Sequence, residues 1–211
     1  MNNSEWASVA IGTEIPFGGA KGDLRLRGIN PNGTATGLYT YSTITFTYPT
    51  VDVACIGDIR TLQDWRNYNI VETNNARFCY LFLNCSVLTS APELPAKKLA
   101  DHCYYEMFYD CTSLTAAPKL SAIELAEACY CKMFYGCENL SSVTMLAPSD
   151  KIKNTSNPVI RWLDKAGTKA TTRTIKVQDE AAYNELESNT KYLPDIWKKG
   201  QCTVEYYTPK P

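Results

Sequence analysis

Hydrophobic and polar positions recur every 26 residues through the middle of the chain. The segments RFCYLFLNCSVLTSAPEL, CYYEMFYDCTSLTAAPKL and CYCKMFYGCENLSSVTML begin at Arg77, Cys103 and Cys129, and we refer to them as the first, second and third copies. A cysteine recurs at positions 85, 111 and 137, and a leucine at positions 88, 114 and 140. Self-similarity at one fixed period indicates a repeat architecture in which each copy packs against the next.

Each copy changes its hydrophobic period along its length. In the second copy apolar residues fall at every fourth position from Leu99 to Cys111, which is typical of one face of a helix, and an extended piece follows from Leu114. Pro118 excludes a helix in that piece and disfavours a central ladder bond, whereas the piece from Leu140 has the clearest strand pattern. The pattern therefore predicts one helix and one short strand in each copy.

A unit of this size cannot bury its own apolar face, so the copies are expected to stack. Stacking would place the strands in a short parallel sheet. Leu88, Leu114 and Leu140 would then form one interior ladder, and Cys85, Cys111 and Cys137 a second.

The repeat also resembles a known family. The run MFYDCTSLTAAPKL from Met107, with LPAKKLADHCYYE before it, is similar to the BspA-like leucine-rich repeats of surface proteins of gut anaerobes and of their phages and prophages. The resemblance is strong over residues 72–146. It is weaker over GDLRLRGIN from Gly22 and around Trp162 and Trp197, and this chain departs from the family in having only three copies, the first eroded. The resemblance implies adhesion or attachment.

We therefore predict an α/β fold, a short leucine-rich-repeat solenoid of three 26-residue repeats over residues 71–148, with parallel strands plus helices. Residues 21–70 would form a β-rich N-terminal cap, because Leu24 and Leu26 alternate with arginines, and Ile44, Phe46 and Tyr48 alternate with threonines. Residues 1–20 show no evident partner within the chain. They are predicted to be a docking segment, with Trp6 as its anchor.

Residues 149–211 lose the period and are predicted to form a mixed α/β C-terminal cap. A short helix is expected to begin at Asn157 and Pro158 and to end at Gly167. A strand near residues 172–177, a helix from Asp179 to Ser188 with Asp179 as its cap, and a strand near residues 202–206 would follow. Residues 208–211 are expected to be a loose tail.

Composition narrows the choice of chemistry. The 21 basic residues nearly balance the 22 acidic ones, so net charge gives no reason to expect nucleic acid as a partner.

Nine cysteines suggest either zinc or disulfides. Cys129 and Cys131 would lie on different helix faces, which argues against a metal site. A cysteine that recurs as a repeat position, in an odd total, favours buried free thiols, with disulfides between neighbouring copies as the alternative.

No constellation of catalytic residues stands out. His102 is the only histidine and is expected on the outer face of a repeat helix. Glu124 and Glu127 are expected to be solvated, and no phosphate-binding glycine loop or nucleophile elbow is present. We therefore expect no enzymatic activity, no cofactor and no bound metal.

Tyrosines recur with the repeat and allow two interpretations. Tyr105, Tyr109 and Tyr135, with Tyr104 and Tyr130 partly turned outward, would form columns across the copies. They can serve as packing between copies, or as an outward surface that contacts protein or glycan. The strand face that bears Thr89, Thr115 and Ser141 is the next candidate surface.

The first twenty residues lack the pattern of a secretory signal, and no apolar run is long enough to span a membrane, so no membrane insertion is expected. A bacterial surface protein carries an export signal, whereas a virion component assembles in the cytoplasm and needs none. We therefore predict a non-catalytic phage virion component, a head or tail decoration or fibre subunit, that displays its repeats for host attachment. Its partners would be other structural proteins or copies of itself, with a host surface protein or glycan as candidate ligand. The alternative is a BspA-like bacterial cell-surface or secreted adhesin expressed without its leader.

Overall fold

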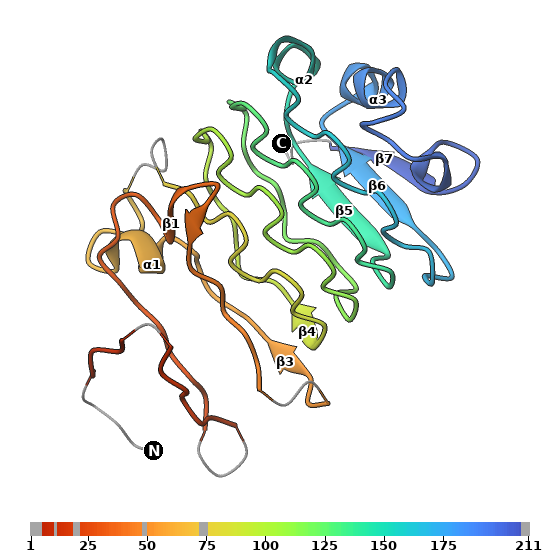
Figure 1. Ribbon diagram of the computed structural model, residues 1–211. Helices are drawn as coiled ribbons and strands as arrows, with labels where there is room; N and C mark the ends of the chain where they lie inside the picture. The colour runs from red at the N-terminus through yellow and green to blue at the C-terminus, as the bar shows by residue number, and fades with distance from the viewer. Residues whose placement is uncertain (1–5, 11, 19–21, 48–49, 72–75, 208–211) are drawn as a thin grey trace.

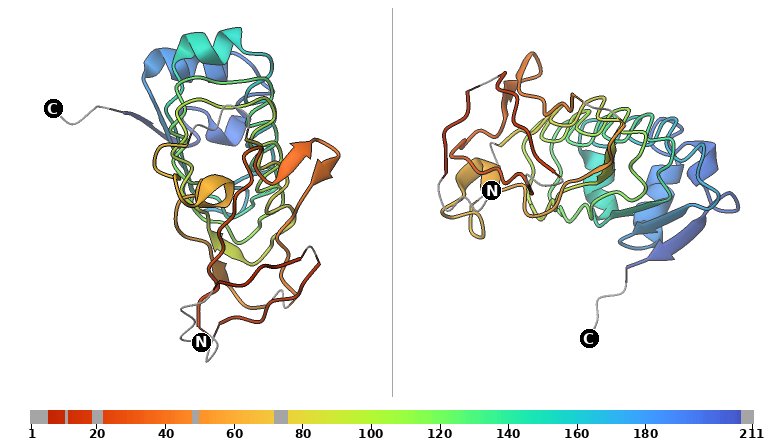
Figure 2. Two further views of the ribbon diagram at one scale, coloured as in Figure 1. Left: turned by 90° about the vertical axis from the view of Figure 1, so that its left-hand side faces the viewer. Right: turned by 90° about the horizontal axis from the view of Figure 1, so that it is seen from below.

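The structure is a computed structural model that describes residues 6–10, 12–18, 22–47, 50–71 and 76–207. It is a mixed α/β fold with parallel sheets and few helices, in which successive coils of the chain lie side by side along one axis (Figures 1 and 2). Tyr48 and the tail expected at residues 208–211 lie outside the described residues. None of the helices found in the described ranges is long and apolar enough to cross a membrane.

The strands are parallel along most of the stack. The strands β5 (Ser142–Met145), β6 (Thr174–Val177) and β7 (Thr203–Tyr206) form one three-stranded parallel sheet in that order. The strand β3 (Val53–Ala54) pairs in parallel with β4 (Leu88–Ser90). Between these two sheets, isolated parallel bridges join Ala116 to Ser142 and Leu120 to Met145 on either side of Pro118. The three strands expected at residues 140–146, 172–177 and 202–206 are thus confirmed.

The segments expected to be repeat helices are not α-helical. In the second copy the N–H groups of alternate residues donate to the carbonyl three residues earlier, at 3.1–3.2 Å. The residues between them donate instead to carbonyls 25 residues further along the chain, from Glu127 to Tyr135, at 2.8–3.0 Å. The donating residues are His102, Tyr104, Glu106, Phe108 and Asp110. The segment is therefore a row of consecutive turns in which every second peptide is tied to the neighbouring copy.

Backbone conformation explains why the prediction of a helix was wrong. His102, Glu106 and Asp110 all have positive φ angles, of 58°, 49° and 54°, which an α-helix does not contain. An α-helix turns every 3.6 residues, so positions four apart drift by about 40° at each step. A sequence that places apolar residues at every fourth position fits a four-residue turn repeat equally well. Asn157, Arg161 and Lys165 repeat the positive φ angles, so the helix expected from Asn157 is absent for the same reason.

The interior consists of ladders that run along the stack. Leu88, Leu114 and Leu140 are each 0% exposed, which confirms the expectation that all three are buried. Phe82, Phe108 and Phe134 stack nearly parallel, with ring centroids 5.5 and 5.6 Å apart. A second stack joins the rings of Phe78, Tyr104 and Tyr130. Tyr104 and Tyr130 are 1% exposed, so the expectation that they turn partly outward was wrong.

The C-terminal end of the stack closes around two tryptophans. Trp162 and Trp197 are fully buried, and their indole N–H groups donate to the carbonyls of Tyr192 and Ala166 at 2.6 and 3.0 Å. The helix α3 (Glu180–Glu187) lies where it was expected, with the Asp179 carboxylate accepting from the N–H of Ala182 at 2.8 Å. The helix α2 (Ser149–Asn154) and the short 3-10 helix η2 (Asp195–Trp197) were not anticipated.

The N-terminal region has less regular structure than predicted. The strands β1 (Ala35–Gly37) and β2 (Thr40–Tyr41) form an antiparallel pair, and α1 (Thr61–Asp64) is one helical turn. The alternating residues 24–27 and 43–47 form no strand in the described part of the chain. Ile44 donates to the carbonyl of Leu81 at 2.7 Å, but residues 79–84 form turns, so no strand ladder is available there.

Candidate functional site

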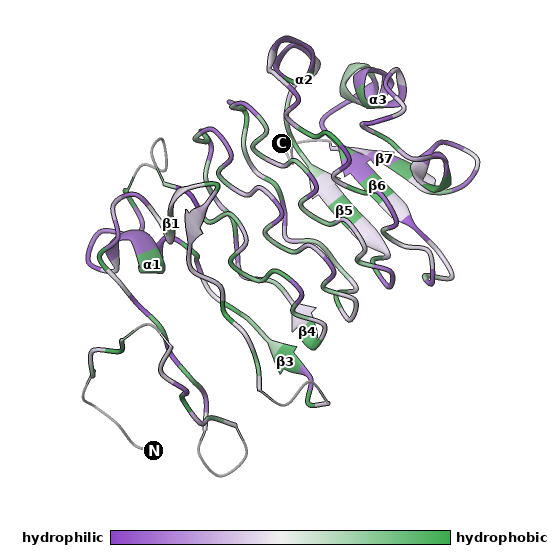
Figure 3. Cartoon of the chain, in the orientation of Figure 1, coloured by the Kyte–Doolittle hydropathy of each residue, from purple (hydrophilic) through white to green (hydrophobic). Residues whose placement is uncertain are grey.

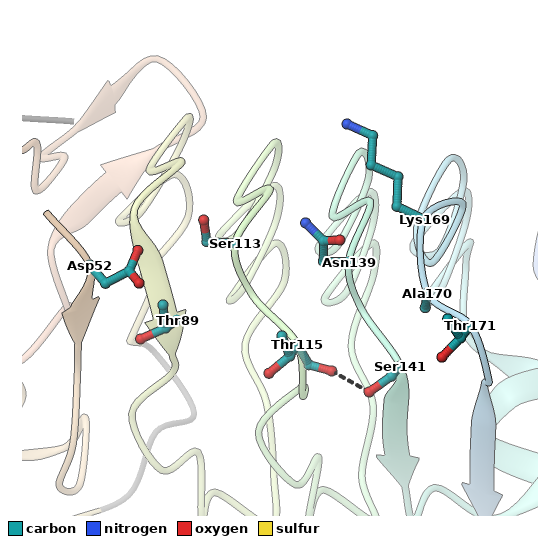
Figure 4. A pocket seen from close by; sticks show the side chains of 9 residues that line it. All are labelled: Asp52, Thr89, Ser113, Thr115, Asn139, Ser141, Lys169, Ala170 and Thr171. Carbon is teal, nitrogen blue, oxygen red and sulfur yellow. Dashed lines mark hydrogen bonds between the residues drawn. The ribbon is translucent and has the colours of Figure 1, made fainter. Parts of the chain in front are cut away.

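A groove of about 480 Å³ crosses several coils near the starts of β3, β5 and β6 (Figure 4). Small polar side chains supply most of its lining. The lining residues are Asp52, Thr89, Ser113, Thr115, Asn139, Ser141, Lys169, Ala170 and Thr171.

The repeat aligns these side chains in two rows. Thr89, Thr115 and Ser141 occupy equivalent positions in the three copies, and Ser113 and Asn139 are equivalent in the second and third. Thr171 and Lys169 continue the rows from the coil that follows the third copy. Neighbouring parallel segments lie about 4.8 Å apart, so the rows form a closely spaced array.

The same extended segments build the groove and the core. Ser113 and Thr115 flank the buried Leu114, and Asn139 and Ser141 flank the buried Leu140. Successive side chains of extended backbone point to opposite sides, so packing each leucine inward turns Thr115 and Ser141 outward, while Ser113 and Asn139 lie in the turns that precede the leucines. Figure 3 shows hydrophobic and hydrophilic stretches alternating along the coils. The groove is therefore a direct consequence of the leucine ladder.

Some of the polar groups in the groove already use their hydrogens within the protein. The Ser141 hydroxyl donates to the Thr115 carbonyl at 2.8 Å, and the Thr89 hydroxyl donates to the Val53 carbonyl at 3.2 Å. The Asn139 amide donates to the Thr112 carbonyl at 2.8 Å. These bonds fix the side chains and leave their oxygen atoms as acceptors.

Two charged side chains lie in the lining, and their environments differ. The Lys169 ammonium lies 2.5 Å from a carboxylate oxygen of Glu138. Asp52 is exposed and forms no ion pair with any other described residue. With Lys169 neutralised, the groove carries one uncompensated carboxylate.

The three tyrosines proposed as an outward surface pack across the coils. Tyr109 and Tyr135 stack at 4.7 Å with a 7° interplanar angle, and Tyr105 meets the ring of Tyr80 edge-on at 5.5 Å. The cationic groups of Arg161 and Lys165 lie 5.4 and 5.2 Å from the Tyr135 ring. All three tyrosines are half-buried, which supports their packing role and leaves the role of outward surface a prediction.

Trp6 has a partner within the chain, contrary to expectation. The Arg27 guanidinium lies 3.7 Å from the ring centre of Trp6 and 3.7 Å from that of Trp65, so the arginine lies between two indoles. Further along the segment, Glu14 accepts a hydrogen bond from Thr47 at 2.8 Å. Trp6 is nevertheless 50% exposed. Docking through residues 1–20 remains a prediction, and residues 1–5, 11, 19 and 20 lie outside the described part.

The nine cysteines are free thiols, and seven of them are buried. Cys111 and Cys137 donate to the carbonyls of Phe82 and Phe108, in the preceding copies, at 3.1 and 3.0 Å. Burial raises the pKa of Cys85 and of Cys129 to about 12. These thiols are therefore protonated at neutral pH and unsuited to nucleophilic attack.

The other candidates for chemistry do not assemble into a site. His102 is half-buried at a positive-φ turn, with its ring 5.9 Å from that of Tyr105. Within the described ranges, no three His, Cys, Asp or Glu side chains are grouped so that they could hold a metal ion.

Comparison with known proteins adds no family or relative, because no family model, curated protein or solved structure matches the chain.

Proposed function

We propose that the chain is a leucine-rich-repeat solenoid that binds a ligand in the polar groove and catalyses no reaction. Three 26-residue repeats over residues 71–148 would form its body, between a β-rich N-terminal cap and a mixed α/β C-terminal cap. Hydrogen bonds that join residues 25 apart in consecutive copies, together with the interior leucine ladder, support this architecture. Repeats stacked in this way give an extended, rigid binding surface.

The observation that carries the binding function is the groove itself. Five coils contribute polar side chains to it, and the fixed hydroxyls of Thr89 and Ser141 need no reordering before they bind. A surface whose side chains are held in place loses less conformational entropy on binding. The groove offers no imidazole or thiol, the usual bases and nucleophiles of catalysis.

In this proposal the protein is a phage virion component, a head or tail decoration or fibre subunit, and the groove contacts the host surface. The assignment to a virion rests on the resemblance of residues 72–146 to repeats that also occur in phages. Mass spectrometry of density-banded virions tests it, because peptides of this chain should band with the capsid proteins. Recovery only from the bacterial envelope or culture medium would favour the adhesin instead.

Binding is tested separately with the purified chain. Labelled protein should bind host cells and reduce adsorption of the phage when added in excess. Replacing Tyr105, Tyr109 and Tyr135 with phenylalanine keeps the ring packing and removes three hydroxyls, so it tests the tyrosine surface without dismantling the stack. We expect that variant to bind normally. Loss of binding would show that the host surface contacts the tyrosines rather than the groove.

A further inference from the structure

The groove favours ligands that donate hydrogen bonds. The Thr89 and Ser141 hydroxyls have committed their one hydrogen to backbone carbonyls, so their oxygen atoms can only accept, and Asn139 has committed one of its two amide hydrogens. Ser113, Thr115 and Thr171 form no side-chain hydrogen bond to any other described residue. Their hydroxyl groups can therefore both donate and accept hydrogen bonds to a ligand. Acceptors therefore outnumber donors across the lining.

Charge in the groove acts against anionic ligands. Asp52 has no cationic partner in the described part of the chain, while the one ammonium of the lining, on Lys169, is paired with Glu138. A sulfate, phosphate or carboxylate brought to the acceptor rows would meet oxygen lone pairs and an uncompensated carboxylate. Lys169 is the one cation of the lining that could pair with such a ligand, and it would have to leave Glu138 to do so.

The lining also lacks the features that hold a peptide side chain. Ala170 is its one apolar residue, and no aromatic or large aliphatic residue lines it. Peptide grooves take affinity from hydrophobic pockets or from pairing with a strand edge. Here the rows cross the coils, and five coils spaced about 4.8 Å apart extend the array over roughly 19 Å. A chain molecule with regularly repeated hydroxyl groups matches this array.

We propose that the groove binds an uncharged glycan chain laid along the stacking axis, and that Asp52 disfavours anionic glycans. This inference rests on the proposed binding function and specifies its ligand class. Sugar hydroxyls would donate to the fixed oxygens of Thr89 and Ser141 and exchange hydrogen bonds with Thr115 and Thr171. The ligand would remain largely hydrated on its outer side, because the groove is open to solvent.

The test is an array of immobilised neutral oligosaccharides together with sialylated, sulfated and uronic-acid-bearing ones, probed at physiological salt. Wild-type protein should bind neutral glycans in preference to the anionic ones. T115V keeps the side-chain shape at an exposed position and removes one hydroxyl, so it should weaken neutral binding roughly fivefold. T203V makes the same change on β7, outside the groove, and should bind as wild type does. D52N should raise the signal for anionic glycans severalfold.

Each contrary result has a distinct meaning. Preference for anionic glycans, lost in T115V, would overturn the inferred ligand class and leave the groove as the binding site. If no neutral glycan binds while T115V still loses attachment to host cells, the ligand is a protein and the glycan inference is wrong. If T115V and wild type bind neutral glycans and cells equally, the groove is not the site and the proposed function fails with it.

Discussion

The carboxylate of Asp110 occupies the space in which a Cβ atom at Gly136 would lie. The two residues are equivalent positions in the second and third copies, and Gly136 has a φ angle of +72°. Asp110 itself adopts a φ of 54°, so the positive angle alone does not require glycine here. The contact between the coils adds a second constraint, which a rotation of the Asp110 side chain can relieve. Gly136 is therefore the position at which the third copy makes room for a side chain of the second.

Gly136→Ala should destabilise the protein by about 1–2 kcal/mol, mainly through the strain of the left-handed backbone and in smaller part through the displacement of the Asp110 carboxylate. Urea denaturation gives the change in free energy of unfolding. The double variant D110G/G136A should recover the part that comes from the collision. Additive effects of D110G and G136A would show that the two side chains do not compete for this space.

Leu114 lies between two other members of the leucine ladder and is 0% exposed. Leu114→Ala should lower the free energy of unfolding by about 2–5 kcal/mol, because it leaves a cavity between Leu88 and Leu140. Ile123→Ala is the control: its side chain is 47% exposed, and the change should be about 0.5 kcal/mol or less. Similar losses at the two positions would contradict the ladder as the centre of stability.

The sequence predicted those features that depend on local signals. Recurrent leucines and cysteines located the interior ladders, and the Asp179 cap and the β5 pattern located α3 and the last sheet. An α-helix and a row of four-residue turns have nearly the same hydrophobic period over the length of one copy. The hydrophobic pattern therefore could not distinguish the two structures. His102 and Glu106 adopt positive φ angles although neither is a glycine, so the sequence gives no sign of this backbone conformation.

The groove was predictable only in part. Thr89, Thr115 and Ser141 follow from the repeat, since each adjoins a leucine of the ladder. Asp52, Lys169 and Thr171 lie outside the three copies, and only the stacking of the flanking coils brings them to the same groove. The cation–π contact of Trp6 with Arg27 likewise joins distant residues in an irregular region, and the hydrophobic periodicity of the sequence does not predict such contacts.

The buried thiols should make stability fall at alkaline pH. Burial raises the pKa of Cys85 and of Cys129 from the ordinary value of 9.0 to about 12 in the folded protein. The unfolded chain therefore ionises first, so stability is complete below pH 9 and decreases as the pH rises toward 12. Each such thiol contributes a loss of about 1.4 kcal/mol per pH unit above 9. Urea midpoints measured with reductant from pH 7 to 10 should fall at the upper end, and C129A should reduce the slope. A slope unchanged by C129A would contradict ionisation of this thiol as a cause.

The same burial predicts how the cysteines react with an alkylating reagent. At pH 8 the native protein should leave its seven buried thiols unmodified for hours, whereas denaturation without reductant should give nine alkylations in the intact mass. Cys55 and Cys202 are half-buried and should react first as denaturant is added. Fewer than nine modifications in the denatured sample would show that disulfides join neighbouring copies.

Residues 1–20 should be dispensable for folding and necessary for assembly. The described part of the segment contacts the rest of the chain through exposed groups: the Trp6–Arg27 cation–π contact, which contributes about 0.5–1 kcal/mol, the Thr47–Glu14 hydrogen bond and the Phe17–Phe46 ring contact. Deleting the segment should therefore lower the unfolding free energy without unfolding the protein. The deleted protein should no longer sediment with purified virions, because a tryptophan seated in a partner's pocket can contribute ~2 kcal/mol or more. W6A should give a weaker form of the same defect, and T115V should sediment normally, since the groove lies on other elements. Unfolding of the deleted protein would instead make residues 1–20 part of the N-terminal cap, with Trp6 acting through Arg27 and Trp65 rather than through a partner.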